Sequence, residues 1–464
     1  MRKILVWLGI VFVGLVSVTW PVSVTVSKPG GGGTYATVQE GINAAGANGT
    51  VTILDSQTYI EDVTIASAQA GVMVTAAAGQ RPTIQAVNGV NRPVYAGIGI
   101  VSPSDHFGIS VQGSCTLEGL NISNLDPTCN THATLGVLSA AAVIIHVPGV
   151  TVRDCHIFGP GAGFGAGDWT ACLVVAFSPI PAAAQLENCE IYGAEYGVVD
   201  ETFSNAMPTW ADSFLTLTAC DIHNNTAAGL TVDAGVTTVT RCLIHDNPGT
   251  GVSGGGGKTV LVGCDILNNN TGMSLSWNSD FARQNDWPNV TARDCMIFHN
   301  GTTNRNIQID DGLLTLDHSI ISQGGRGGIL LQHDNPADAI LDMNFCDIFA
   351  PGQTCVEFEG PGAKQAFASI RNSILYGNNG VLCDPAHRAG VGFSSVFVTG
   401  GTAFQNTVTS NTVAIEPRYI NSSSSVRGDF CYLNDDLNVG EGGAQIGSQG
   451  RYQPTDVRRW MGYD

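Results

Sequence analysis

Apolar and polar residues alternate in short runs along most of the chain, and the runs are separated by Gly, Asn or Asp. Gly229-Leu230-Thr231-Val232-Asp233 is one such run and Gly328-Ile329-Leu330-Leu331 is another. A period of two directs one face of a strand into a core and the other toward water. The pattern predicts many short strands, and helical spacing occurs only in residues 35–45, where we expect a short helix at the end of the strand array.

A Cys, a variable residue and an Ile recur together along the middle of the chain, with consecutive steps as short as 22 residues. A constant short coil with loops of variable length is typical of a solenoid. Each coil has a second strand after this motif, so stacking the coils predicts an all-β parallel β-helix. The motif begins at Cys155, Cys189, Cys220, Cys242, Cys264, Cys295 and Cys346.

These seven cysteines share the face of the apolar Ile that follows, so we expect a row of buried thiols rather than disulfides. Neighbouring parallel strands lie ~4.8 Å apart, which does not suit disulfide geometry. The absence of a close Cys pair argues against a metal site. The pairing of the other six cysteines stays open.

The chain ends differ from the repeat. Residues 1–20 carry a basic start and an apolar run, which predict an export signal or an uncleaved membrane anchor. Residues 21–415 form the predicted β-helix, and residues 416–464 a C-terminal coil and cap. We therefore expect a secreted or cell-surface protein with one structural domain, which contacts a membrane only if the anchor is retained.

The net charge of −19, with four lysines, argues against binding to nucleic acid or anionic lipid. It also disfavours acidic polymers unless a cation such as Ca²⁺ bridges them. The composition does not indicate an oligomeric state.

Three segments carry a family resemblance: residues 35–45 (YATVQEGINAA), residues 57–65 (QTYIEDVTI) and residues 443–447 (GAQIG). They are similar to the ends of many exported bacterial members of the pectate-lyase-like superfamily, and the chain resembles its right-handed parallel β-helix proteins over nearly the whole mature length. The resemblance implies a right-handed solenoid with an N-terminal capping helix and a C-terminal cap. The superfamily includes lyases, hydrolases, esterases, epimerases and noncatalytic proteins, so no single activity follows.

Two local matches are incomplete. Tyr59-Ile60-Glu61 resembles the start of pectin methylesterases, but the later motifs of that family are missing, so we interpret it as structural. Asp310-Asp311-Gly312 is similar to the paired Asp of polygalacturonases, whose other motifs are also absent.

Acidic residues recur at the end of the second strand of successive coils, at five of eight equivalent positions. Asp310 and Glu359 are two coils apart, ~9.6 Å by strand spacing, near the ~6.5–9.5 Å of inverting glycosidases. Asp310, Glu359, Asp311 and His333 are therefore candidate catalytic residues. The equivalent positions are Glu201, Asp233, Gly255, Ser276, Asp310, Gln332, Glu359 and Asp384.

Two other interpretations of these carboxylates stay open. Asp311 and Asp334 could hold Ca²⁺ for a lyase reaction, with Arg305 or Arg326 as the basic group. Alternatively, the acidic residues form a solvated edge that limits aggregation.

Long loops carry the candidate substrate-binding residues. Trp210 lies in residues 202–213, and Trp277 and Trp287 lie in residues 276–288. Asp233 and the Gly run at residues 254–257 would lie between these loops. Tryptophan rings beside polar groups commonly stack on sugars, although they can equally pin a loop to the solenoid.

The leading hypothesis is an exported β-helix protein that binds a polysaccharide along its loop-bearing edge. Whether it also cleaves the polymer, by hydrolysis or by Ca²⁺-assisted elimination, stays open. The alternative is a noncatalytic, adhesive surface solenoid.

Overall fold

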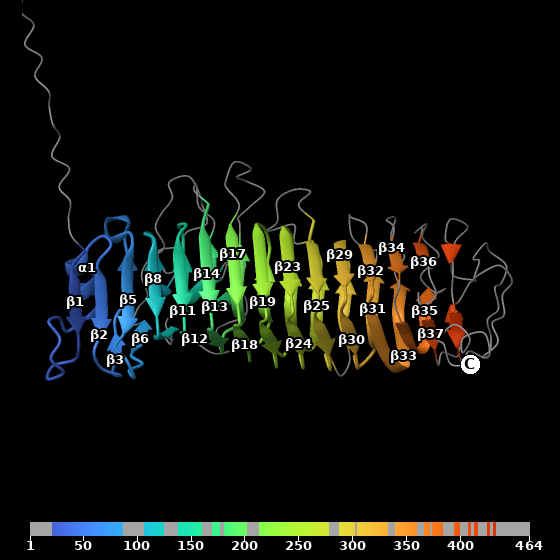
Figure 1. Ribbon diagram of the computed structural model, residues 1–464, viewed down its shortest axis with the longest axis horizontal. Coiled ribbons are helices and arrows are strands. Elements are labelled where there is room, and N and C mark those ends of the chain that lie inside the picture. The colour runs from blue at the N-terminus through green and yellow to red at the C-terminus, as the bar shows by residue number, and fades with distance from the viewer. Residues whose placement is uncertain are drawn as a thin grey trace, which may run out of the picture.

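The chain winds into an elongated solenoid in the computed structural model (Figure 1). For some residues of the strands, Glu359 among them, only the backbone is described and not the side chain. The structure describes residues 21–86, 106–124, 138–159, 169–176, 181–201, 213–277, 287–301, 304–332, 339–359, 366–371, 374–383, 394–399, 407–409, 413–415, 425–426 and 430–432.

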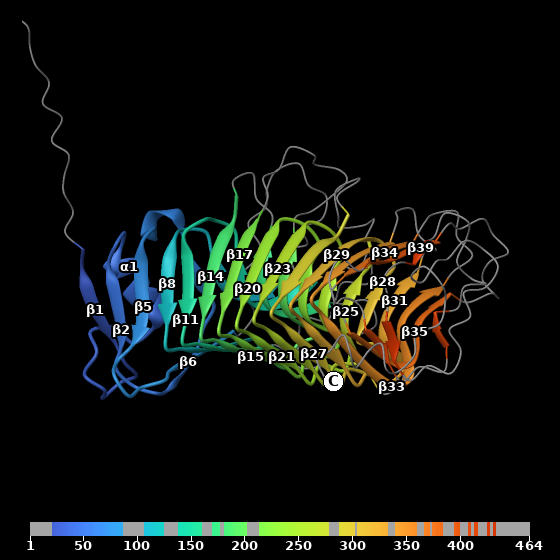
Figure 2. The ribbon, with the colours of Figure 1, turned by 45° about the vertical axis from the view of Figure 1, so that its right-hand side comes forward.

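Each full coil contributes one strand to each of three ladders, and every strand pairing within the ladders is parallel. In one coil, β14 is followed by β15 and β16, and the chain then returns to the first ladder at β17. Figure 2 shows the ladders running along the length of the molecule. The second and third ladders join where β33 and β35 each span both. Stacked coils thus bury one continuous core between the ladders.

The first ladder consists of β1 (Ser23–Val26), β2 (Thr50–Ile53), β5 (Val72–Ala76), β8 (Cys115–Glu118), β11 (Val150–Arg153), β14 (Ala183–Glu187), β17 (Phe214–Thr218), β20 (Val236–Thr240), β23 (Lys258–Val262), β26 (Asn289–Arg293), β29 (Gly312–Asp317), β32 (Ala339–Asn344), β34 (Ala366–Arg371), β36 (Ser394–Thr399) and β39 (Ser425–Val426). The second consists of β3 (Thr58–Ile60), β6 (Thr83–Ala86), β9 (Asn121–Asn124), β12 (His156–Phe158), β15 (Glu190–Tyr192), β18 (Asp221–His223), β21 (Leu243–His245), β24 (Asp265–Leu267), β27 (Met296–Phe298), β30 (Ile320–Ser322), β33 (Asp347–Glu359), β35 (Ile374–Cys383), β37 (Thr407–Thr409) and β40 (Phe430–Tyr432). The third consists of β4 (Val63–Ile65), β7 (His106–Val111), β10 (Leu138–Ile145), β13 (Trp169–Ala176), β16 (Tyr196–Glu201), β19 (Ala228–Val232), β22 (Thr250–Gly254), β25 (Thr271–Leu275), β28 (Ile307–Ile309), β31 (Gly327–Gln332), parts of β33 and β35, and β38 (Val413–Ile415).

The predicted parallel β-helix is confirmed, with one strand more per coil than the sequence indicated. The strands of the first ladder, such as Phe214–Thr218, alternate apolar and polar residues but lack the Cys-containing motif. The variable residue and the Ile of that motif lie on the second ladder, and the runs opened by Gly lie on the third. Described strands continue the ladders as far as Tyr432, past the boundary expected at residue 415.

Sharp bends between the first and second ladders place the residue before the Cys in the left-handed region. Asn188, Ala219, Arg241 and Asp294 each precede a ladder Cys and have φ values between 52° and 54°. This left-handed conformation is uncommon outside Gly and costs free energy for residues with a Cβ. The coil keeps its shape because the stacked neighbours impose the same bend at every turn.

The row of buried thiols is confirmed for the described part of the chain. The ten cysteines whose side chains the structure describes are all buried, and none of these ten is in a disulfide. The thiols donate to nearby carbonyls; Cys264 Sγ, for example, lies 3.5 Å from Val262 O. The backbone N–H of Cys220 also donates to Cys242 Sγ over 3.3 Å. The sulfur atoms therefore fill the core and satisfy some backbone groups at the bend.

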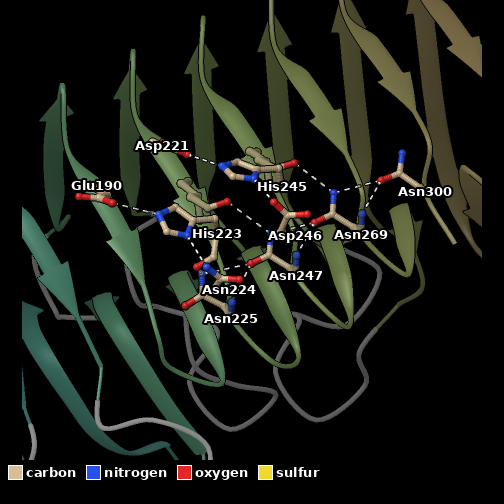
Figure 3. Close-up of polar contacts among 12 residues, drawn as sticks. Glu190, Asp221, His223, Asn224, Asn225, His245, Asp246, Asn247, Asn269 and Asn300 are labelled. Carbon is tan, nitrogen blue, oxygen red and sulfur yellow. Dashed lines mark hydrogen bonds and ion pairs between the residues drawn. The ribbon is translucent and has the colours of Figure 1, made fainter.

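A second internal row consists of asparagines at the bend between the second and third ladders. Asn225, Asn247, Asn269 and Asn300 are buried, and Figure 3 shows them side by side on successive coils. The Asn247 side-chain oxygen accepts from the backbone N–H of Asn225 (2.9 Å) and from its side-chain amide (3.2 Å). The side-chain amide of Asn247 donates to Asn269 (2.8 Å). Each asparagine thus satisfies a buried N–H that the bend leaves out of the strand ladders.

The predicted N-terminal helix is present as α1 (Val38–Ala45), near η1 (Ser67–Gln69). The Glu61 carboxylate accepts from the backbone N–H groups of Val38 and Gln39 (2.8 and 3.0 Å). An acceptor at this end satisfies donors that an α-helix leaves unpaired. This contact gives Glu61 a structural role, as interpreted from the sequence.

Candidate functional site

The outer face of the third ladder carries a row of uncharged polar side chains across four successive coils. Thr231 pairs in register with Ser253, Ser253 with Ser274, and Ser274 with Gln308. Three strand spacings make this row ~14 Å long. We call these four residues the hydroxyl–amide row. They occupy the outward positions of the alternating runs, which predicted a polar face but not a binding role.

The predicted column of residues at the end of the third-ladder strands borders this row. The structure confirms that its members Asp310, Gln332 and Glu359 lie in register at the ends of successive strands. The Asp310 N–H donates to Leu275 O (2.8 Å), as Ser276 N–H does to Gly254 O (3.0 Å) one coil earlier. Gln332 then pairs with Glu359, so Asp310 and Glu359 are two strands apart. Their separation along the ladder therefore stays ~9.6 Å by strand spacing.

Asp310 and Asp311 have different surroundings although they are adjacent in sequence. Asp310 is half-buried and accepts from the Gln308 side-chain amide (2.9 Å). Asp311 is fully buried, and its carboxylate accepts from the backbone N–H of Trp277 (3.3 Å). Asp311 thus holds the start of the Trp-bearing segment, while Asp310 remains partly accessible.

Trp277 and Trp287 form a pair beside these carboxylates. Their ring centroids are 4.7 Å apart and the ring planes are inclined by 57°. Both residues remain partly exposed. The indole Nε1 of Trp277 is buried and has no hydrogen-bond acceptor among the described residues.

The structure corrects the expected floor between the two long loops. Asp233 is only 4% exposed, and residues 254–257 are buried. Asp233 lies next to the bend that leads back to the first ladder, where its N–H donates to Asp200 O (3.0 Å). Asp200 is itself fully buried and accepts from the hydroxyls of Ser213 and Thr237. The prediction of an exposed acidic column is therefore wrong at Asp233.

Arg305 does not match the expectation of an available basic group. Its guanidinium is 8% exposed, forms an ion pair with Glu357, and donates to Arg326 O (2.8 Å). Gly327 accommodates this arrangement, because a Cβ there would lie 3.0 Å from the guanidinium. Arg326 is exposed, but it lies just before the start of β31. The predicted column passes through Gln332, at the opposite end of that strand.

Several predicted site residues cannot be placed. Trp210, His333, Asp334 and Asp384 lie outside the described residues, and the Glu359 side chain is not described. No group of three His, Cys, Asp or Glu side chains within the described ranges is arranged to hold a metal ion. The Ca²⁺ site at Asp311 and Asp334 therefore stays a prediction.

The outer face of the second ladder carries an aromatic stack that the sequence reasoning missed. Phe158, Tyr192, His223 and His245 stack on successive coils with centroids 5.1–5.6 Å apart. Figure 3 shows the two imidazoles beside acidic side chains, with Asp221 2.9 Å from His245. The rings stack on one another from coil to coil, so this stack stabilises the packing of successive coils.

Residues 181–345 match the protein-family model described as the right handed beta helix region. This range contains the hydroxyl–amide row, the Trp pair and Asp310. The protein is a right-handed parallel β-helix. The family resemblance found in the sequence is thus confirmed at the level of this fold. No curated protein sequence matches the chain.

Solved structures with a similar arrangement have diverse activities. The catalytic unit of an α-1,3-glucanase from Streptomyces thermodiastaticus is 12% identical, with a TM-score of 0.39; the match covers 90% of this chain and 66% of that one. The A-module of the mannuronan C-5 epimerase AlgE4 from Azotobacter vinelandii is 13% identical, with coverages of 89% and 93% and a TM-score of 0.38. The Streptococcus pneumoniae surface protein and adhesin PfbA is 9% identical, with coverages of 88% and 94% and a TM-score of 0.33. These likenesses concern the fold alone.

Proposed function

We propose that this β-helix protein is exported and binds a polysaccharide across the third ladder, at the Trp277–Trp287 pair and the hydroxyl–amide row. The Trp pair beside Asp310 carries the proposal. Indole rings offer flat apolar surfaces to sugar rings, and both rings are partly exposed. Hydroxyl, amide and carboxylate groups beside the rings can exchange hydrogen bonds with sugar hydroxyls.

Cleavage of the bound polymer would use Asp310 with Glu359. One carboxyl would protonate the leaving oxygen while the other activates water. The half-buried position of Asp310 and the two-strand separation support this assignment. A noncatalytic adhesive solenoid has the same binding face but no turnover.

Affinity electrophoresis of the full chain against a panel of plant, algal and bacterial polysaccharides tests binding. We expect at least one polymer to retard the protein, and Trp277→Ala to weaken that interaction about tenfold or more, the loss typical of a buried aromatic anchor. Phe349→Ala is the matched control, because this exposed ring lies on β33 in the second ladder. Absence of retardation by every polymer, or equal losses in both variants, contradicts the proposal.

Turnover is measured on the retarding polymer by reducing-sugar release and by absorbance at 235 nm, with and without Ca²⁺. If Asp310 is an acid or base, Asp310→Asn lowers the rate of hydrolysis about 10²–10⁴-fold and leaves retardation intact. Unsaturated products would instead indicate elimination. Binding without turnover in any condition assigns the noncatalytic alternative.

A further inference from the structure

The hydroxyl–amide row bears no charge, although the protein as a whole is strongly acidic. Its four side chains are hydroxyls and one amide, aligned on adjacent strands. Thr231 is largely buried, and its hydroxyl has no hydrogen-bond partner in the part of the chain that the structure describes. We propose that this face selects uncharged polysaccharides and rejects polyuronates, an inference that rests on the proposed function.

A polyuronate carries one carboxylate per sugar, and its binding requires cations at a similar spacing. We compare three basic residues of the described chain, Arg305, Arg326 and Lys258, with this requirement. Arg305 is already paired with Glu357, so its charge is neutralised. Arg326 lies just before the start of β31, and Gln332, the neighbour of Asp310 in register, ends that strand. Six residues of extended strand separate Arg326 from Gln332 by ~20 Å.

Lys258 is the third basic residue. It is exposed, and it is the first residue of β23. On the neighbouring strand it pairs with Asn289, which follows Trp287 by two residues. A single lysine at the rim can pair with one carboxylate of a polymer but cannot match a repeating series. It lies on the first ladder, outside the hydroxyl–amide row.

Carboxylates at the same edge add repulsion. Asp310 is half-buried beside Gln308, and Asp311 is buried one residue further along. Charges closer than the Debye length of ~10 Å at 0.1 M salt interact, and like charges at a binding surface cost several kcal/mol. An uncharged sugar has hydroxyls in place of the carboxylate and avoids this cost.

A chemically matched ligand pair tests the inference. The neutral hexose polymer that retards the protein most strongly is compared with the same polymer after its primary hydroxyls are oxidised to carboxylates. We expect the oxidised polymer to bind at least about tenfold more weakly, and the difference to shrink as the salt concentration rises.

A charge-introducing variant provides the second arm. Ser274→Lys places a cation in the middle of the hydroxyl–amide row, and we expect it to improve binding of the oxidised polymer relative to the neutral one. Ser322→Lys, on β30 of the second ladder, is the control and should leave the ratio unchanged. Equal or tighter binding of the oxidised polymer by the wild type overturns the inference but leaves the proposed function intact. If no neutral or oxidised polymer binds, the proposed function itself fails.

Discussion

Asn247→Ala is expected to lower the free energy of unfolding by about 2–4 kcal/mol, the range of a broken buried hydrogen-bond network. The Asn247 side chain accepts from Asn225 and donates to Asn269. Alanine supplies neither group, so the buried N–H of Asn225 loses its acceptor. Neighbouring coils share the row, and the loss therefore affects three coils. Urea unfolding followed by circular dichroism measures the change.

Asn289→Ala is the matched control, because Asn289 is exposed at the start of β26. A surface substitution of this kind typically changes stability by less than about 0.5 kcal/mol. Similar unfolding midpoints for Asn247→Ala and the wild type would contradict the structural role of the asparagine row.

Cys115, Cys155, Cys346 and Cys355 are expected to resist thiol reagents in the native protein at pH 8. Burial raises the pKa of the Cys115, Cys155 and Cys355 thiols to about 12 and that of Cys346 to about 11. Only the thiolate reacts, so a pKa near 12 lowers the reactive fraction roughly 10³-fold relative to an ordinary thiol near 8.5. Pulse alkylation with peptide mass spectrometry gives the rate at each site, before and after denaturation.

The same pKa shifts predict that stability falls in alkali. The unfolded thiols lose protons near pH 8.5, whereas the folded thiols keep them until about pH 11–12. The unfolded state therefore binds fewer protons between these values, and the free energy of unfolding declines across this window. Rapid labelling of Cys155 in the folded protein, or a urea midpoint that rises from pH 9 to pH 11, would contradict the buried row of thiols.

Local patterns were sufficient to predict the coil but not its internal polar contacts. The Cys-containing motif revealed the repeat because Cys155 and its equivalents share the alternation that also places Ile157 in the core. In the sequence, the asparagine row shows only as an Asn that often follows the Cys-containing motif. Its role depends on a bend in which Asn224 and Asp246 adopt positive φ. Asn and Asp favour this conformation locally, but the hydrogen bonds along the row form only between stacked coils.

The candidate site shows the same division. Strand counting predicted the register of Asp310 with Glu359, since every parallel pair advances by one coil. It did not predict the burial of Asp233, which depends on packing at the bend toward the first ladder. The contact between Asp311 and the Trp277 backbone joins residues 34 positions apart, and no periodic pattern encodes it.

Fluorine NMR on protein labelled with 5-fluorotryptophan tests the proposed binding face most directly. The chain has seven tryptophans, and Trp277→Phe and Trp287→Phe assign the two relevant resonances by their loss. Adding oligosaccharides from the retarding neutral polymer should shift the Trp277 and Trp287 resonances in a saturable way and leave most of the others in place. Saturable binding that leaves both resonances unchanged would contradict the assignment of this face.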